Sequence, residues 1–173
     1  MSELMESDRR VAYHEAGHAV VVWALGRGIN QICITGQIGH RGHTCADPFE
    51  TPPEGMDDPA KQQRWVRERA ITYSIAGAVA EEIKFGDYNE EPARHDEGDL
   101  PYGGPLRADE REHVWAEATR YLRDHWPAVE ALVPALVSPP MTLHGELVEE
   151  IIQKALDPEV IRRRQSRCPW LCD

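Results

Sequence analysis

Residues 12–26 of the chain read AYHEAGHAVVVWALG, a mostly small and apolar run with three polar residues in its middle. Apolar residues recur here at helical spacing, which predicts a helix over residues 7–25. His14 and His18 lie on the same stripe as the apolar residues, so they should face the core. Because leucines would pack better at these two positions, the helix predicts a chemical site as well as a core element.

The two histidines are four residues apart, so their side chains lie one turn apart on one helix face. Two imidazoles placed in this way can bind one ion at about 2.0–2.1 Å each. Glu15 lies about 100° further round the helix and can lean toward a water on the open side of the metal. Zinc lowers the pKa of such a water towards ~7, and a carboxylate can then take its proton. The H-E-x-x-H pattern therefore predicts His14 and His18 as Zn²⁺ ligands and Glu15 as the general base. The alternative is that both histidines are core residues with hydrogen-bond partners.

Two imidazoles do not complete a catalytic zinc site, which has three protein ligands and one open position. The third ligand must come from a distant part of the chain, and spacing alone does not choose it. The candidates are two glutamates of a predicted long helix and three residues of the acidic loop after it: Glu81, Glu82, His95, Asp96 and Asp99.

Two further patterns have weaker functional interpretations. His40 and His43 lie three apart beside Cys45 and could form a separate metal site, although polar residues are ordinary in such a glycine-rich turn. The acidic segments 47–58 and 87–99 could attract calcium or a basic partner, but charge runs are usually solvated surface.

Composition limits the class of protein. With 173 residues and 41% apolar content, the chain can bury one core, so we expect a single domain over 1–173 with a C-terminal helical tail at 157–173. A net charge of −11 argues against nucleic acid as a partner. No window approaches the ~20 apolar residues of a membrane span, and the N-terminus lacks a signal-peptide pattern, so a cytoplasmic protein with no membrane partner is expected.

The order of elements predicts a mainly helical α+β fold. Short β-branched runs over residues 29–46 predict two or three strands, which form a small sheet next to the first helix. Asp58, Pro59 and Gly86 are start and stop signals for a long helix. An irregular loop is expected at 87–106, and four more helices are expected at 108–125, 127–137 (kinked or split by Pro134), 143–156 and 158–167.

The four cysteines do not indicate an exported, disulfide-linked protein. Cys33 and Cys45 flank the predicted hairpin and could face one another across it, and Cys168 and Cys172 lie in the tail. Because nothing signals an oxidising compartment, we expect free or packed thiols.

Four segments together resemble the FtsH family of ATP-dependent membrane zinc metalloproteases. They are HEAGHAVV, ICITGQIGHRGHT, IAGAVAEEIKFGD and AVEALVPALVSPPMTLHGELVEEII, and they cover most of residues 10–153 in the family's order. The resemblance implies a mainly helical zinc-peptidase domain with a small β-sheet. It also implies His14 and His18 as zinc ligands and Glu15 as general base.

In the family the third ligand is an aspartate shortly after the Phe-Gly step, in a "SNDL"-like context. Asp99, followed by Leu100, matches that context, whereas Asp96 better fits the spacing from Gly86. The resemblance therefore favours Asp99, with Asp96 as the alternative. Glu81 and Glu82 match the family's paired glutamates, which implies a structural role or a role behind the metal ligands. The alternative is that both belong to a solvated helix face.

The chain departs from the family by lacking transmembrane segments, a nucleotide-driven module and any G-x-x-x-x-G-K-[ST] loop. We therefore expect a stand-alone, ATP-independent zinc metalloendopeptidase acting on unfolded or flexible polypeptides. An extended substrate would pair with an edge strand at Gly42, His43 and Thr44. A homo-oligomer and an ATPase partner in trans are both compatible with this expectation. The alternative is a catalytically silent zinc-binding module with a regulatory or binding role.

Overall fold

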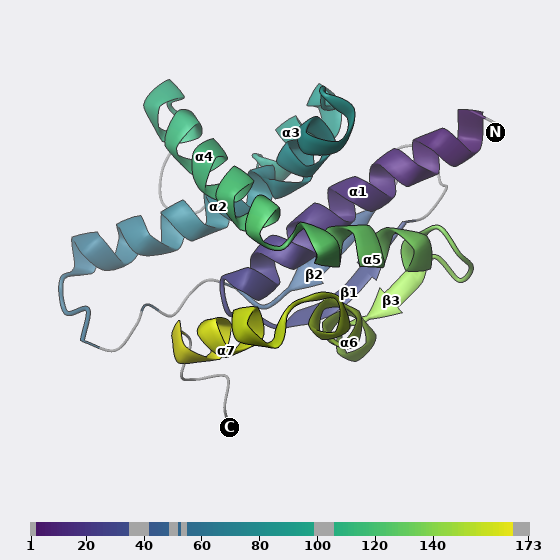
Figure 1. Cartoon of the computed structure of the whole chain (residues 1–173). Coiled ribbons are helices and arrows are strands. Elements are labelled where there is room, and N and C mark those ends of the chain that lie inside the picture. The colour runs from purple at the N-terminus through teal and green to yellow at the C-terminus, as the bar shows by residue number, and fades with distance from the viewer. Residues whose placement is uncertain (1–2, 35–41, 49–51, 53–54, 99–105, 168–173) are drawn as a thin grey trace.

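The computed structural model describes residues 3–34, 42–48, 52, 55–98 and 106–167 (Figure 1). The chain forms a mainly helical domain with a small three-stranded sheet beside the first helix, as the sequence predicts. Its elements in chain order are α1 (Glu3–Ala24), β1 (Ile29–Cys33), β2 (His43–Ala46), α2 (Pro59–Phe85), α3 (Glu90–Asp96), α4 (Ala108–Asp124), α5 (Trp126–Leu136), β3 (Thr142–His144), α6 (Gly145–Ala155) and α7 (Pro158–Arg167).

Helix α1 is the central element, and α2, α5 and the sheet pack around it (Figure 1). It begins at Glu3, one turn earlier than predicted, and its second half is buried. Gly17 makes the close approach of α1 to α2 feasible, because a Cβ there would lie 2.6 Å from Cβ of Ala80 and 2.7 Å from the carbonyl oxygen of Ala76. The two helices are therefore in near backbone contact beside His14 and His18.

Helix α2 has the boundaries that its local signals predict. The Asp58 side chain accepts a hydrogen bond from the Ala60 N–H, and Pro59 occupies the first turn, where its missing N–H costs nothing. Gly86 ends the helix in a left-handed conformation with φ of 84°, which glycine adopts without a steric penalty. The resulting helix is 27 residues long.

The sheet is antiparallel in the order β2-β1-β3, so β2 is an edge strand. Its third strand comes from residues 142–144, where the sequence predicts the start of a helix, and so the helix expected at 143–156 begins only at Gly145. A Cβ at Gly145 would lie 1.7 Å from the carbonyl oxygen of Ile29, so α6 can begin here against β1 only with glycine.

Helix α3 corrects the prediction of an irregular loop over 87–106. The Asn89 side chain caps it by accepting from the Glu91 N–H. Acidic residues occupy its first turn, and Arg94 and His95 its last, which suits the helix dipole. These local signals outweigh Pro92, which lies within the first turn, where proline is tolerated.

The remaining helices lie within two residues of their predicted ends. Pro134 lies inside α5 and does not split it. Helices α4 and α5 pack on α2 and α1, while α6 packs on α5 and the sheet (Figure 1). None of the described helices is long and apolar enough to span a lipid bilayer.

Candidate active site

A cleft of about 650 Å³ opens between α1, β2, α2 and α3. His14, Glu15 and His18 form its floor from α1, and all three are buried, with exposed fractions of 4–5%. Asp96 at the end of α3 and Thr44 on β2 also line the cleft. The cleft therefore brings polar side chains from four separate elements to one place.

The ring of His18 is fixed by the backbone of α2. Its Nδ1 lies 2.8 Å from the carbonyl oxygen of Tyr73. A carbonyl oxygen can only accept, so Nδ1 carries the proton and, in the neutral ring, Nε2 presents a lone pair. This Nε2 lies 3.3 Å from Oδ2 of Asp96.

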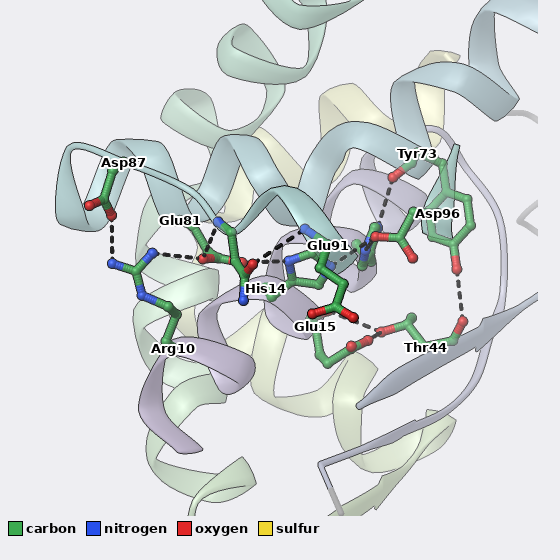
Figure 2. A network of polar contacts seen from close by, with 11 residues as sticks. Arg10, His14, Glu15, Thr44, Tyr73, Glu81, Asp87, Glu91 and Asp96 are labelled. Atoms are coloured by element: carbon green, nitrogen blue, oxygen red, sulfur yellow. Dashed lines mark hydrogen bonds and ion pairs between the residues drawn. The ribbon is translucent and has the colours of Figure 1, made fainter. Parts of the chain in front are cut away.

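The ring of His14 is held by a buried carboxylate. Its Nδ1 donates to Oε1 of Glu81 at 2.8 Å, and its Nε2 lies 2.9 Å from Oδ2 of Asp96 (Figure 2). Both imidazoles thus use Nδ1 for orientation and turn Nε2 toward one carboxylate oxygen. An oxygen or carboxylate behind a ligating histidine is the usual arrangement that fixes its tautomer at a metal centre.

These three atoms suit a cation. The ligand atoms of His14, His18 and Asp96 all lie within 4.8 Å of one another, and in their neutral-ring and ionised forms all three are acceptors. In a tetrahedral zinc site with bonds of about 2.0–2.1 Å, ligand atoms are about 3.3 Å apart. The observed separations of 2.9 and 3.3 Å are close to that value. Nitrogen and oxygen donors of this kind are also those that zinc prefers.

The electrostatics of the cluster also suit a cation. Burial alone would lower the pKa of His14, but the hydrogen bonds that its ring donates to Asp96 and Glu81 outweigh burial and raise the pKa to about 10. Burial alone would raise the pKa of Asp96, yet the two histidines hold it well below its usual range. The cluster therefore attracts positive charge strongly.

The Glu15 carboxylate also faces the cleft and is held by the edge strand (Figure 2). Thr44 Oγ1 lies 2.8 Å from Oε2 of Glu15 and 3.1 Å from its backbone oxygen. Gly42 lies against the other oxygen, since a Cβ there would be 2.5 Å from Oε1. Gly42 and strand β2 thus pack closely against the candidate base.

The part of the chain that holds the cleft matches a known protein family. The model of peptidase family M41 matches residues 3–96, which is more than half of the chain and includes all the cleft residues named above. This chain belongs to peptidase family M41. The M41 domain is thus a zinc metallopeptidase-like domain, and its mainly helical fold is the one the resemblance implied.

A relative of the M41 domain is the ATP-dependent zinc metalloprotease FtsH of Thermobaculum terrenum. The two are 35% identical over 83 residues, which is 47% of this chain and 12% of the relative. That relative is therefore much longer than the part that the M41 domain matches.

The structure brings together three of the predicted site residues of the M41 domain, His14, Glu15 and His18. Asp99 lies outside the described residues, so its role stays a prediction. Asp96, the alternative, lies against both imidazoles. Of the paired glutamates, Glu81 lies behind His14, whereas Glu82 faces away and accepts from Nε1 of Trp115 at 2.8 Å.

The other predicted site residues lie at the cleft wall. Gly42, His43 and Thr44 line the cleft at the edge strand, with His43 exposed. His40, the partner expected for a second metal site, lies outside the described residues.

Cys33 and Cys45 are free thiols in the structure. Cys33 is paired with His43 and Cys45 with Gln31, so the two cysteines are two positions out of register. The prediction that they could face one another across the hairpin is therefore wrong. Cys168 and Cys172 lie outside the described residues.

Sequence reasoning missed three residues that shape the site. Arg10 is bonded to Glu81, Tyr73 supplies the carbonyl that orients His18, and Gly77 leaves room for the His14 ring. The helical spacing of Arg10, one turn before His14, was an available signal. The sequence contains no signal for the role of Tyr73, because the group that binds His18 is a backbone carbonyl, which every residue has.

Proposed function

We propose that this M41 domain is a zinc metalloendopeptidase whose metal ligands are His14 Nε2, His18 Nε2 and Asp96 Oδ2. The observation that carries the proposal is the convergence of these three acceptor atoms. Over the described residues the cluster has three ligands, the number typical of catalytic zinc sites, which keep one position open. A purely structural zinc site has four protein ligands, so this count favours an enzyme over a silent module.

Glu15 is the proposed general base. A zinc ion bound by the three ligands supplies Lewis acidity toward the scissile carbonyl and makes water a stronger acid. The Glu15 carboxylate removes the proton of the attacking water and then passes it to the leaving amine. Because Thr44 holds Oε2, we assign the proton transfers to Oε1.

The proposed substrate is an extended, unfolded stretch of polypeptide. Strand β2 pairs only with β1 within the described sheet, which leaves its other edge for a substrate strand along Gly42, His43 and Thr44. All the groups assigned to hydrolysis belong to this chain. Cleavage of chains that are already unfolded should therefore require no ATP, and an ATPase partner in trans would serve folded substrates only.

The test is cleavage of unfolded casein by the zinc-loaded protein and by Glu15→Gln, with zinc content measured in parallel. We expect cleavage by the wild type without ATP and its loss on chelation. Glu15→Gln should lose cleavage but keep zinc, whereas Glu6→Gln, an exposed glutamate on the same helix, should behave as wild type. Zinc binding without wild-type cleavage would favour the silent module, and cleavage by Glu15→Gln would remove its assigned role.

A further inference from the structure

Arg10 lies one helical turn before His14 on α1 and reaches two carboxylates that lie outside this helix (Figure 2). Its Nη1 donates to Oε2 of Glu81 at 2.9 Å, and its Nη2 donates to Oδ1 of Asp87 at 2.6 Å. The guanidinium also lies 4.6 Å from the centre of the Phe85 ring. Arg10 therefore joins α1 to the end of α2 and to the turn that leads into α3.

Glu81 is a deeply buried carboxylate, with 2% of its surface exposed, so both of its oxygens need partners. Oε1 accepts from Nδ1 of His14. Oε2 accepts from Arg10 and, at 3.2 Å, from the backbone N–H of Asn89. With Oε2 held by two donors, the carboxylate cannot turn away from His14.

The same carboxylate also fixes the helix that carries Asp96. Asn89, whose N–H binds Glu81, is the N-cap of α3, and α3 ends at Asp96. Asp87, the second partner of Arg10, belongs to the short connection between α2 and α3. The contacts of Arg10 therefore lead to two of the three proposed ligands, His14 through Glu81 and Asp96 through α3.

We propose that Arg10 is a positioning residue for the metal centre, which holds Glu81 and the α2–α3 connection so that His14 and Asp96 converge on one point. This inference rests on the proposed metal site and assigns Arg10 a role in zinc affinity. For the change in zinc affinity when Arg10 is replaced, this role predicts the opposite sign from electrostatics alone. Removing a positive charge near a dication should strengthen cation binding through Coulomb forces alone, whereas loss of positioning should weaken it.

The test measures Zn²⁺ affinity of the full chain by competition with a chromophoric chelator. Arg10→Met should weaken affinity about 10-fold, the lower end of the range for partners behind metal ligands. Arg10→Lys keeps the charge but cannot reproduce the two-armed contact. Its zinc affinity should therefore lie between that of the wild type and that of Arg10→Met. Arg9→Met is the matched control, because Arg9 is an exposed neighbour on the same helix, and its affinity should equal the wild type.

A double-mutant cycle separates positioning from general destabilisation. Once Glu81→Gln has removed one charged partner and only the Asp87 contact of Arg10 remains, Arg10→Met should weaken zinc affinity by a smaller factor than it does in the wild-type background. Equal losses in both backgrounds, or unchanged or tighter zinc binding by Arg10→Met alone, would overturn the role of Arg10. Absence of stoichiometric zinc binding by the wild type would instead overturn the proposed function, and this inference with it.

Discussion

Replacing Gly77 with alanine should disable the metal centre of a chain that still folds, because α2 passes directly against the ring of His14 at this residue. A Cβ at Gly77 would lie 2.4 Å from Nε2 of His14, 2.5 Å from Cδ2 and 2.6 Å from Cε1. Ordinary contact at such a position begins at 3.4 Å. The ring must therefore retreat by about 1 Å, and the displaced atoms include the proposed ligating nitrogen.

The ring has little freedom to make this movement. Nδ1 is bonded to the buried Glu81, and α1 is packed against α2 at Gly17. A misplacement of about 1 Å costs on the order of 10²-fold in rate at a catalytic centre, and a disturbed ligand shell costs about 10–100-fold in metal affinity. Alanine also favours a helix over glycine by up to about 1 kcal/mol, which offsets part of the strain and should keep the variant folded.

The assay compares zinc affinity, casein cleavage and thermal unfolding of Gly77→Ala with those of the wild type. Gln63→Ala, at an exposed position of the same helix, is the control and should leave all three unchanged. Wild-type zinc affinity together with wild-type cleavage in Gly77→Ala would show that the ring does not need this space, and it would refute the arrangement of His14 described above.

Two other predictions concern the base and the pH dependence of stability. Gly42→Ala should lower the cleavage rate about 10-fold or more without loss of zinc, because its Cβ would lie 2.5 Å from Oε1 of Glu15; an unchanged rate in a single-turnover assay would contradict this. Burial lowers the pKa of His125, and this effect outweighs the hydrogen bond to the Tyr121 carbonyl, which raises it. As the pH falls through about 6.5, His125 therefore takes up a proton in the unfolded chain before it does so in the folded chain. The free energy of unfolding should therefore fall as the pH drops below about 6.5, and urea titrations at several pH values should show a shallower fall for His125→Gln.

The long helices could be predicted because their signals are local. Asp58, Pro59 and Gly86 define the ends of α2 through contacts with near neighbours in sequence. Strand β3 could not be predicted in the same way, because its three residues become a strand only by pairing with β1, more than 100 positions earlier. Helix α3 had local signals as well, but at seven residues it was too short for apolar periodicity to mark it within an acidic segment.

In the candidate site, too, local geometry could be predicted from the sequence and long-range contacts could not. The sequence by itself determined that His14 and His18 share one helix face and that Glu15 lies beside them, because helix geometry sets the relative directions of residues one to four apart. Only the tertiary structure decided that the Asp96 carboxylate meets both imidazoles, that Glu81 and a backbone carbonyl hold their Nδ1 atoms, and that Thr44 holds the base. These contacts join residues 29 to 82 positions apart, and no local rule specifies them. They exist because packing α2, α3 and β2 around α1 buries polar atoms that must then find partners.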